Sequence, residues 1–192
     1  MDVTVKDVFV GELNTCCYVL WEENSTGCVV IDPGAEAEKI LEATAGHPIE
    51  AVLLTHGHFD HIAAVEQLMQ DGTELIIHRD DEKMLSDPFL NVSWLIRRPL
   101  TVSLPVKTVN EGEKLSYAGM IFSVMHTPGH TPGSVCYRLG NWIFSGDTIL
   151  EHGYGRTDFP GGSDEQMQKS LKRLNALKEH VIFFPGHADW DK

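Results

Sequence analysis

Residues 55–61 read Thr55-His56-Gly57-His58-Phe59-Asp60-His61, which places three imidazoles and one carboxylate within six positions. The apolar residues 51–54 precede this stretch, and apolar side chains recur at helical spacing over residues 62–69. We expect a strand, a sharp turn at Gly57 and then a helix. Such a path lets His56 and His58 converge on one point while Asp60 and His61 face another. Histidines on a solvated loop would explain one or two of these residues but not their spacing. The stretch therefore predicts two adjacent metal sites.

Three later candidates also stand in loops that follow, or lie between, predicted strands. Residues 121–125 lead to His130, residues 142–145 lead to Asp147, and residues 181–184 lead to His187. Ligands in open sheets collect at the carboxyl ends of the strands. Asp147 is best placed to bridge the two metals. The predicted metal ligands are thus His56, His58, Asp60, His61, His130, Asp147 and His187. His126 and His152 lie near these residues and are weaker candidates for contacting a ligand or the substrate.

Nitrogen and carboxylate ligands without thiolate suit two divalent ions, with Zn²⁺ as the first expectation and Fe or Mn as alternatives. Two such cations lower the pKa of a bridging water toward 7, so that hydroxide attacks an acyl carbon. Asp60 is the predicted catalytic residue, because it would orient the proton of this nucleophile as well as bind metal. A thioester is an attractive substrate, since a thiolate leaves without a strong general acid.

Composition limits the classes of protein and partner. The 192 residues suit a single domain over 1–192, and 42% apolar with 22% charged residues is typical of an ordinary globular protein. The net charge of −13 disfavours nucleic acid and anionic membranes, so a small-molecule substrate is expected. The N-terminus does not resemble a secretory signal and no apolar run is long enough to span a bilayer, which favours the cytoplasm. Free thiols are then expected at Cys16, Cys17, Cys28 and Cys136.

Short apolar runs rich in β-branched residues alternate with helical patterns, which indicates an α/β fold. A strand over residues 28–31 runs into Asp32-Pro33-Gly34 and then a helix over residues 36–45. Residues 163–166 form a capping box that starts a helix, whose apolar face comprises Met167, Leu171, Leu174 and Leu177. Residues 80–109 contain three prolines and predict a short helix followed by loops.

The pattern of His56, His58, Asp60 and His61 matches the HxHxDH signature of the metallo-β-lactamase superfamily, which the chain resembles over nearly its whole length. The resemblance implies that His56, His58 and His130 bind the first metal. It also implies that Asp60, His61 and His187 bind the second, and that Asp147 binds both. The implied fold is a four-layer αββα sandwich.

Within that superfamily, residues 127–134, 145–148 and 155–160 resemble the short glyoxalase II-like (hydroxyacylglutathione hydrolase-like) enzymes. The resemblance implies an acyl thioester substrate such as S-lactoylglutathione. Full-length glyoxalase II carries its glutathione-binding basic residues on a helical C-terminal domain, and we expect no counterpart of that domain in residues 1–192. Residues 188–192 form only a short tail after His187, from which we expect a substrate pocket trimmed on that side.

Two other functions stay open. The stretch around Arg156 also resembles persulfide dioxygenases, in which a single iron would be held by His56, His130 and Asp147. A non-catalytic metal-binding domain is the third hypothesis, and it predicts that some ligands are lost, whereas all seven are present.

Two interpretations of Arg156 stay open. It either binds an anionic group of the substrate or pairs with Asp158 and orders its loop.

Overall fold

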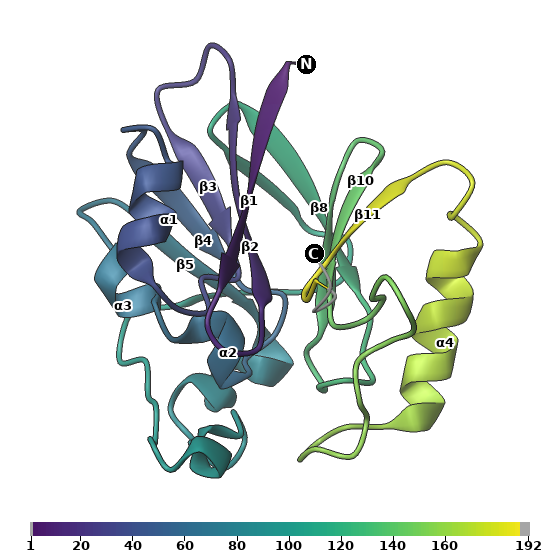
Figure 1. Cartoon of the computed structure of the whole chain (residues 1–192). Coiled ribbons are helices and arrows are strands. Elements are labelled where there is room, and N and C mark those ends of the chain that lie inside the picture. Colours follow the sequence, from purple (N-terminus) through teal and green to yellow (C-terminus); the bar gives the residue numbers. More distant parts are fainter. Residues whose placement is uncertain (1, 189–192) are drawn as a thin grey trace.

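Two β-sheets pack face to face, and helices cover the outer face of each sheet (Figure 1). The computed structural model describes residues 2–188. The expected α/β fold with four αββα layers is confirmed. Residues 189–192, which contain most of the tail predicted to trim the pocket, lie outside the described residues.

The first sheet has six strands, in the order β1-β2-β3-β4-β5-β6. Antiparallel pairing joins β1 to β2 and β2 to β3, whereas β3 to β6 run parallel. The parallel strands end at the same edge of the sheet, and this edge carries the loops after β3 and β4. The strands are β1 (Val3–Val10), β2 (Thr15–Glu22), β3 (Cys28–Ile31), β4 (Ile49–Leu53), β5 (Glu74–His78) and β6 (Lys107–Val109).

The second sheet has five strands, in the order β11-β10-β9-β8-β7. All neighbours in it are antiparallel except β10 and β11, which are parallel. The strands are β7 (Lys114–Tyr117), β8 (Met120–His126), β9 (Val135–Leu139), β10 (Trp142–Gly146) and β11 (Ile182–Pro185). The end of β11 meets the start of β2, where the Tyr18 hydroxyl donates a hydrogen bond to the Pro185 carbonyl at 2.7 Å. This contact brings the C-terminal end of the second sheet next to the first.

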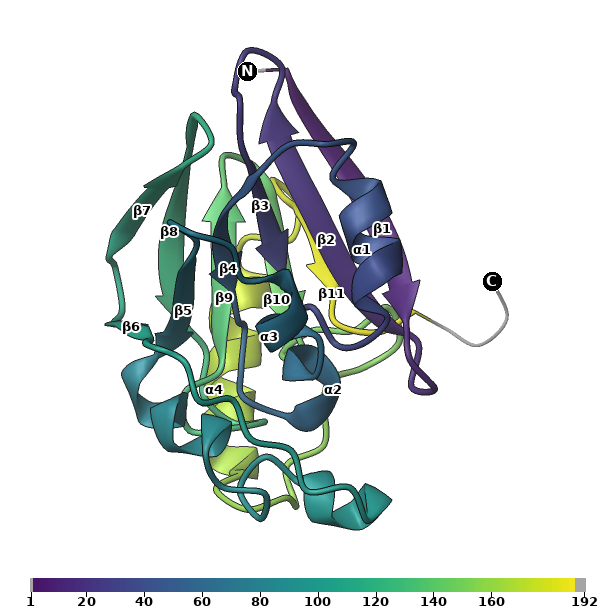
Figure 2. The same ribbon diagram turned by 90° about the vertical axis from the view of Figure 1, so that its left-hand side faces the viewer.

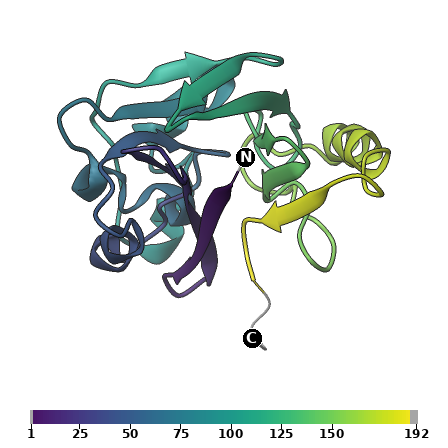
Figure 3. The ribbon, with the colours of Figure 1, turned by 90° about the horizontal axis from the view of Figure 1, so that it is seen from above.

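Helices α1 (Ala37–Ala43) and α3 (Val65–Leu68) cover the first sheet, as Figure 2 shows, and α4 (Asp164–Asn175) covers the second (Figure 3). Ser163 caps α4, because its hydroxyl accepts a hydrogen bond from the Gln166 N–H at 3.3 Å. Met167 and Leu174 of α4 are fully buried. The sequence-based prediction of this helix is confirmed. No helix within residues 2–188 is long and apolar enough to cross a membrane.

The helix predicted after the histidine cluster is instead two short helices, α2 (Phe59–Ile62) and α3. The break falls at Ala64, whose N–H donates to the Pro33 carbonyl at 3.0 Å. A tertiary hydrogen bond thus replaces the one that would continue the helix.

The segment predicted as a short helix with loops contains two 3₁₀ helices, η1 (Arg79–Leu85) and η2 (Ser93–Ile96). It also ends in β6, a strand that the sequence analysis missed. Only one of the three residues of β6 is buried, so its apolar alternation is too short to recognise.

Three clusters of buried side chains fill the space between the layers. One lies between the two sheets and includes Leu20, Phe122 and Phe144. A second lies between the first sheet and its helices, and a third lies beneath α4. All four cysteines are buried and unpaired, as expected. The polar residues predicted to bind metal lie outside these clusters, at one end of the sandwich.

Candidate metal centre

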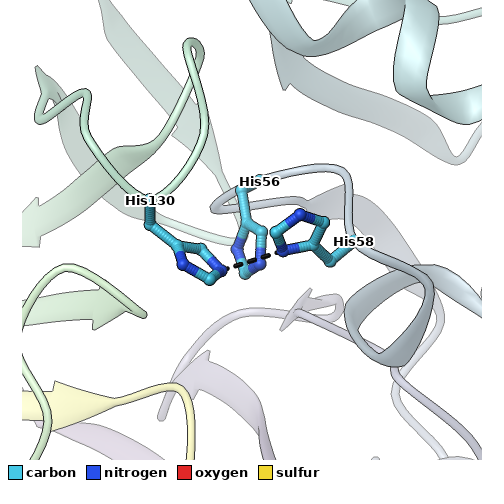
Figure 4. Close-up of side chains that lie close together, drawn as sticks. All are labelled: His56, His58 and His130. Atoms are coloured by element: carbon cyan, nitrogen blue, oxygen red, sulfur yellow. Dashed lines mark hydrogen bonds between the residues drawn. The ribbon is translucent and has the colours of Figure 1, made fainter. Parts of the chain in front are cut away.

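His56, His58 and His130 form the first group of side chains, which Figure 4 shows converging from two loops. His56 and His58 follow β4, and His130 stands between β8 and β9. All three are buried. Nδ1 of His58 lies 2.8 Å from Nε2 of His130, and the rings of His56 and His58 meet edge to face with centroids 4.8 Å apart. The three imidazoles thus point toward one small volume.

Asp60, His61 and His187 form the second group. Oδ2 of Asp60 lies 3.6 Å from Nε2 of His61 and 3.3 Å from Nε2 of His187. The two imidazole nitrogens are 3.3 Å apart. Asp60 and His61 belong to α2, while His187 follows β11 and arrives from the other sheet.

Asp147 lies between the two groups. Its Oδ2 is 3.3 Å from Nε2 of His130 and 3.4 Å from Nε2 of His187, and its Oδ1 is 3.5 Å from Nε2 of His61. The structure therefore brings together all seven residues that the sequence predicted as metal ligands. Within each of three subsets of them, the ligand atoms lie within 4.8 Å of one another.

The unpaired atoms of this centre fit metal ions. Within the described part of the chain, Nε2 of His56, Nε2 of His58 and Oδ1 of Asp147 are buried without a hydrogen-bond partner. Buried polar atoms normally have partners, so each such atom calls for an explanation. Nε2 of His61 and Nε2 of His187 also face each other at 3.3 Å, a separation that two nitrogen ligands of one tetrahedral ion can adopt.

Burial and neighbouring carboxylates shift the pKa values of the histidines in opposite directions. Burial lowers the pKa of His56 well below its usual value and lowers that of His58 to about 3, so both rings are neutral at pH 7. Burial also acts to lower the pKa of His187, but the carboxylates of Asp147 and Asp60 outweigh it and raise the pKa to about 11. The same carboxylates that attract a proton to His187 would attract a metal cation. Neutral imidazoles and ionised carboxylates are the forms that bind metal.

Asp32 supports the centre, although the sequence analysis did not select it. It is buried at the end of β3, and its Oδ2 lies 3.0 Å from Nδ1 of His61. Its carboxylate also accepts hydrogen bonds from the N–H and the hydroxyl of Thr55, at 2.7 Å and 2.6 Å. A proton on Nδ1 of His61 leaves the lone pair on Nε2, the atom that faces Asp60 and Asp147. The sequence did offer one sign of this role. Asp32 begins the turn Asp32-Pro33-Gly34 directly after β3, the strand that pairs with β4.

Asp81 is a second buried carboxylate that the sequence analysis missed. It accepts hydrogen bonds from the hydroxyl of Thr131 and the N–H of Gly133, both at 2.6 Å, and from the N–H of Gly57 at 3.2 Å. These bonds tie the loop of His56 and His58 to the loop of His130. Burial raises the pKa of Asp81 to about 6. Nothing in its local sequence distinguishes it from its neighbour Asp80.

The backbone at Gly186 passes so close to Asp147 that only glycine fits at this position. A Cβ atom at this position would overlap Oδ1 of Asp147. The residue before His187 must therefore lack a side chain for His187 to reach the second group.

The loop after Asp147 contributes its backbone rather than the Arg156 side chain to the centre. The carbonyl of Arg156 lies 2.6 Å from Nδ1 of His130 and holds that ring. The guanidinium donates to both oxygens of Asp158, at 2.6 Å and 2.7 Å. This is the ion pair that the sequence analysis offered as one of two readings.

The two weaker histidine candidates lie apart from the seven. His126 stacks on His78 with ring centroids 4.1 Å apart, and its Nε2 lies 2.9 Å from the Pro132 carbonyl. His152 is exposed on the loop that follows β10. Neither belongs to the three residue groups of the centre.

A cavity of about 510 Å³ opens over the centre. Its floor includes His58, Asp60, His130, Asp147 and His187, and its walls include Leu95, Tyr154 and Phe159. Apolar walls around a few convergent polar groups are typical of small-molecule sites.

The fold and this centre define a class, the metal-binding αββα hydrolases. The family model of the metallo-beta-lactamase superfamily matches residues 10–187, and the chain belongs to this superfamily. The hydroxyacylglutathione hydrolase GloC of Haemophilus influenzae is 33% identical over 198 residues, which cover 99% of this chain and 92% of GloC.

Two solved structures are similar over nearly the whole chain. The BLEG-1 B3 metallo-beta-lactamase has a TM-score of 0.90 with 34% identity, over 97% of this chain and 92% of that one. TTHA1623, solved in a di-iron-bound form, has a TM-score of 0.81 with 36% identity, over 96% and 93% of the two chains. The resemblance stated from the HxHxDH pattern is thereby confirmed.

Proposed function

We propose that this protein is a two-metal hydrolase that cleaves acyl thioesters of small molecules, such as S-lactoylglutathione. Zn²⁺ is the preferred metal, with Fe or Mn as alternatives. His56, His58 and His130 would hold one ion, and Asp60, His61 and His187 the other, with Asp147 shared. The observation that carries this proposal is the second group, Asp60, His61 and His187, which lies beside the first with Asp147 between them.

Divalent metals held there would supply a water of lowered pKa for attack on an acyl carbon and would polarise the carbonyl. The protein's own residues position the reaction. Asp60 lines the cavity and can accept a hydrogen bond from the attacking water, which orients its proton. Asp32 holds His61 in one tautomer through the 3.0 Å contact with Nδ1. A thiolate leaving group needs no strong general acid, so no further acidic side chain is required.

The substrate class rests on similarity and on the shape of the site. GloC, whose name describes a thioester hydrolase, is similar to 99% of this chain. The cavity of about 510 Å³ accommodates a small molecule. Its apolar walls suit the carbon chain of an acyl group.

The test is thioester hydrolysis by the purified, metal-loaded protein, with metal counted per chain. We expect two metals per chain and cleavage of S-lactoylglutathione or other short acyl thioesters. His61→Ala should lose one metal and at least about 100-fold in kcat/KM. His180→Ala is the matched control, because His180 is exposed and lies outside the seven-residue centre. This variant should keep two metals per chain and the wild-type kcat/KM. Intact thioesters after incubation with the two-metal protein would refute the proposal.

The same measurement separates the proposal from a persulfide dioxygenase with one iron on His56, His130 and Asp147. That reaction leaves Asp60, His61 and His187 without a metal to bind. One iron per chain with persulfide-dependent oxygen uptake would favour it over hydrolysis.

A further inference from the structure

Large apolar side chains are exposed beside the metal centre, on residues 92–98. Trp94, Leu95 and Ile96 are 50%, 47% and 47% exposed. Leu95 and Ile96 line the cavity over the centre. Neighbouring exposed apolar side chains at a cavity mouth are typical of a ligand-binding surface.

This segment is held in place by buried polar residues and strained backbone. The amide of Asn91 donates to the carbonyls of Met84 and Leu100, at 2.9 Å and 3.0 Å. Val92 and Arg97 have φ angles of 57° and 54°, the left-handed region that a β-branched residue such as Val92 rarely adopts. Such strain persists only where the surroundings impose it, and it concentrates at functional sites. These contacts of Asn91 fix a segment whose apolar side chains are exposed.

A second cavity of about 470 Å³ adjoins the first. The two share Leu13, Phe59, Asp60 and Ile96, so they lie side by side at these residues. Small residues form much of its lining, including Gly34, where a Cβ would overlap the Asp60 carbonyl. Arg98 also lines this cavity.

Arg98 is an unpaired cation in a chain of net charge −13. Within residues 2–188, no hydrogen bond or ion pair engages its side chain, although Glu12 lines the same cavity. By contrast, Arg156 pairs with Asp158 and Arg173 pairs with Glu111. Arg98, which lines the second cavity, is therefore a cation without a partner among the described residues, whereas Arg156 lines the first cavity with its guanidinium already paired.

We propose that the second cavity binds the thiol part of the thioester, with Arg98 pairing with a carboxylate or phosphate on that part. This inference rests on the proposed function. Hydrolysis forms a C–O bond from water and breaks the C–S bond, and the thiolate takes up a proton as it leaves. The acyl carbon must lie at the metal centre, so the two parts of the substrate extend in opposite directions. Arg98 is exposed at the second cavity, so the thiol can leave to solvent from there.

Four thioesters test which part of the substrate carries the negative charge that Arg98 binds. S-acetyl-N-acetylcysteine and S-acetyl-phosphopantetheine carry the charge on the thiol part, S-succinyl-N-acetylcysteamine carries it on the acyl part, and S-acetyl-N-acetylcysteamine is neutral. Arg98→Gln should raise KM about tenfold for a thioester charged on the thiol part, because a charge-assisted hydrogen bond is lost. KM for the neutral and succinyl compounds should change less than about twofold. The two charged thiols show whether a carboxylate or a phosphate fits better.

Arg97→Gln is the matched control, because Arg97 is the exposed neighbour with the same charge and lines neither cavity. It should change every KM less than about twofold. An equal effect of Arg98→Gln on all four substrates, or no effect on any, would overturn the inference. So would an effect confined to the succinyl compound.

A binding measurement separates this inference from the proposed function, since it needs no turnover. Titration calorimetry with S-methyl-N-acetylcysteine should show binding to the metal-loaded wild-type protein and about tenfold weaker binding to Arg98→Gln. N-acetyl-S-methylcysteamine should bind both proteins equally. If thioesters are not cleaved but this difference holds, the anion site stands and the hydrolase proposal fails. If thioesters are cleaved but the two proteins bind S-methyl-N-acetylcysteine equally, the hydrolase proposal stands and the anion site fails.

Discussion

Replacing Asp32 by Asn is expected to change which nitrogen of His61 carries the proton. In the wild type, the Asp32 carboxylate accepts from the Thr55 N–H, the Thr55 hydroxyl and Nδ1 of His61. An Asn side chain has one oxygen and one NH₂ group. If the oxygen keeps the Thr55 N–H, the NH₂ group faces His61 and donates to Nδ1. The proton of His61 then moves to Nε2, the atom that faces Asp60 and Asp147.

The structure sets the size of this effect. To restore the lone pair on Nε2, the Asn amide must turn over, which leaves the buried Thr55 N–H facing an NH₂ group. An unsatisfied buried donor costs about 1–3 kcal/mol. Affinity for the metal held by Asp60, His61 and His187 should therefore fall by about 10- to 100-fold, in the range known for residues that orient metal-bound histidines.

The assay is competition with a chelator of known affinity, combined with metal counting after dialysis. Asp81→Asn is the matched control, because Asp81 is equally buried but bonds to Gly57, Gly133 and Thr131 and not to His61. It should keep wild-type affinity for the metal held by Asp60, His61 and His187. Wild-type affinity for both metals in Asp32→Asn would refute the assignment of Asp32 as the residue that orients His61.

Three further predictions concern the rest of the molecule. The pKa of Asp81 is about 6 in the folded state and about 3.8 in the unfolded chain, so its protonated form favours folding below pH 4 and that contribution is lost as pH rises through 6. The free energy of urea unfolding of the wild type relative to Asp81→Asn should thus fall by about 2 kcal/mol between pH 4 and 6, and parallel pH curves would contradict this. Leu174→Ala should lower the free energy of unfolding by about 2–5 kcal/mol, because Leu174 is fully buried beneath α4, while Lys172→Ala on the exposed side should change it by less than about 0.5. Arg156→Ala should leave KM for S-acetyl-N-acetylcysteine and for S-succinyl-N-acetylcysteamine within about twofold, because its guanidinium already pairs with Asp158, and a tenfold rise for either charged thioester would make Arg156 a substrate-binding residue.

Local patterns in the sequence determined much of the fold. Helix α4 (Asp164–Asn175) was recognisable because the cap Ser163 and the spacing of Met167 and Leu174 act within one element. The seven candidate ligands were recognisable for a similar reason, since each lies within a few residues of the end of a strand. The family resemblance added the division of these residues into two groups.

Only the tertiary structure decided which residues support those seven. Asp32 reaches His61 across 29 positions, and Asp81 reaches Thr131 across 50, so no local pattern contains either contact. The first depends on the parallel pairing of β3 with β4, and the second on the packing of one sheet against the other. Likewise, the sequence shows Arg98 and Arg156 as equal cations. The fold pairs Arg156 with Asp158 and leaves Arg98 without a partner among residues 2–188, because side-chain partners are set by positions in space rather than along the chain.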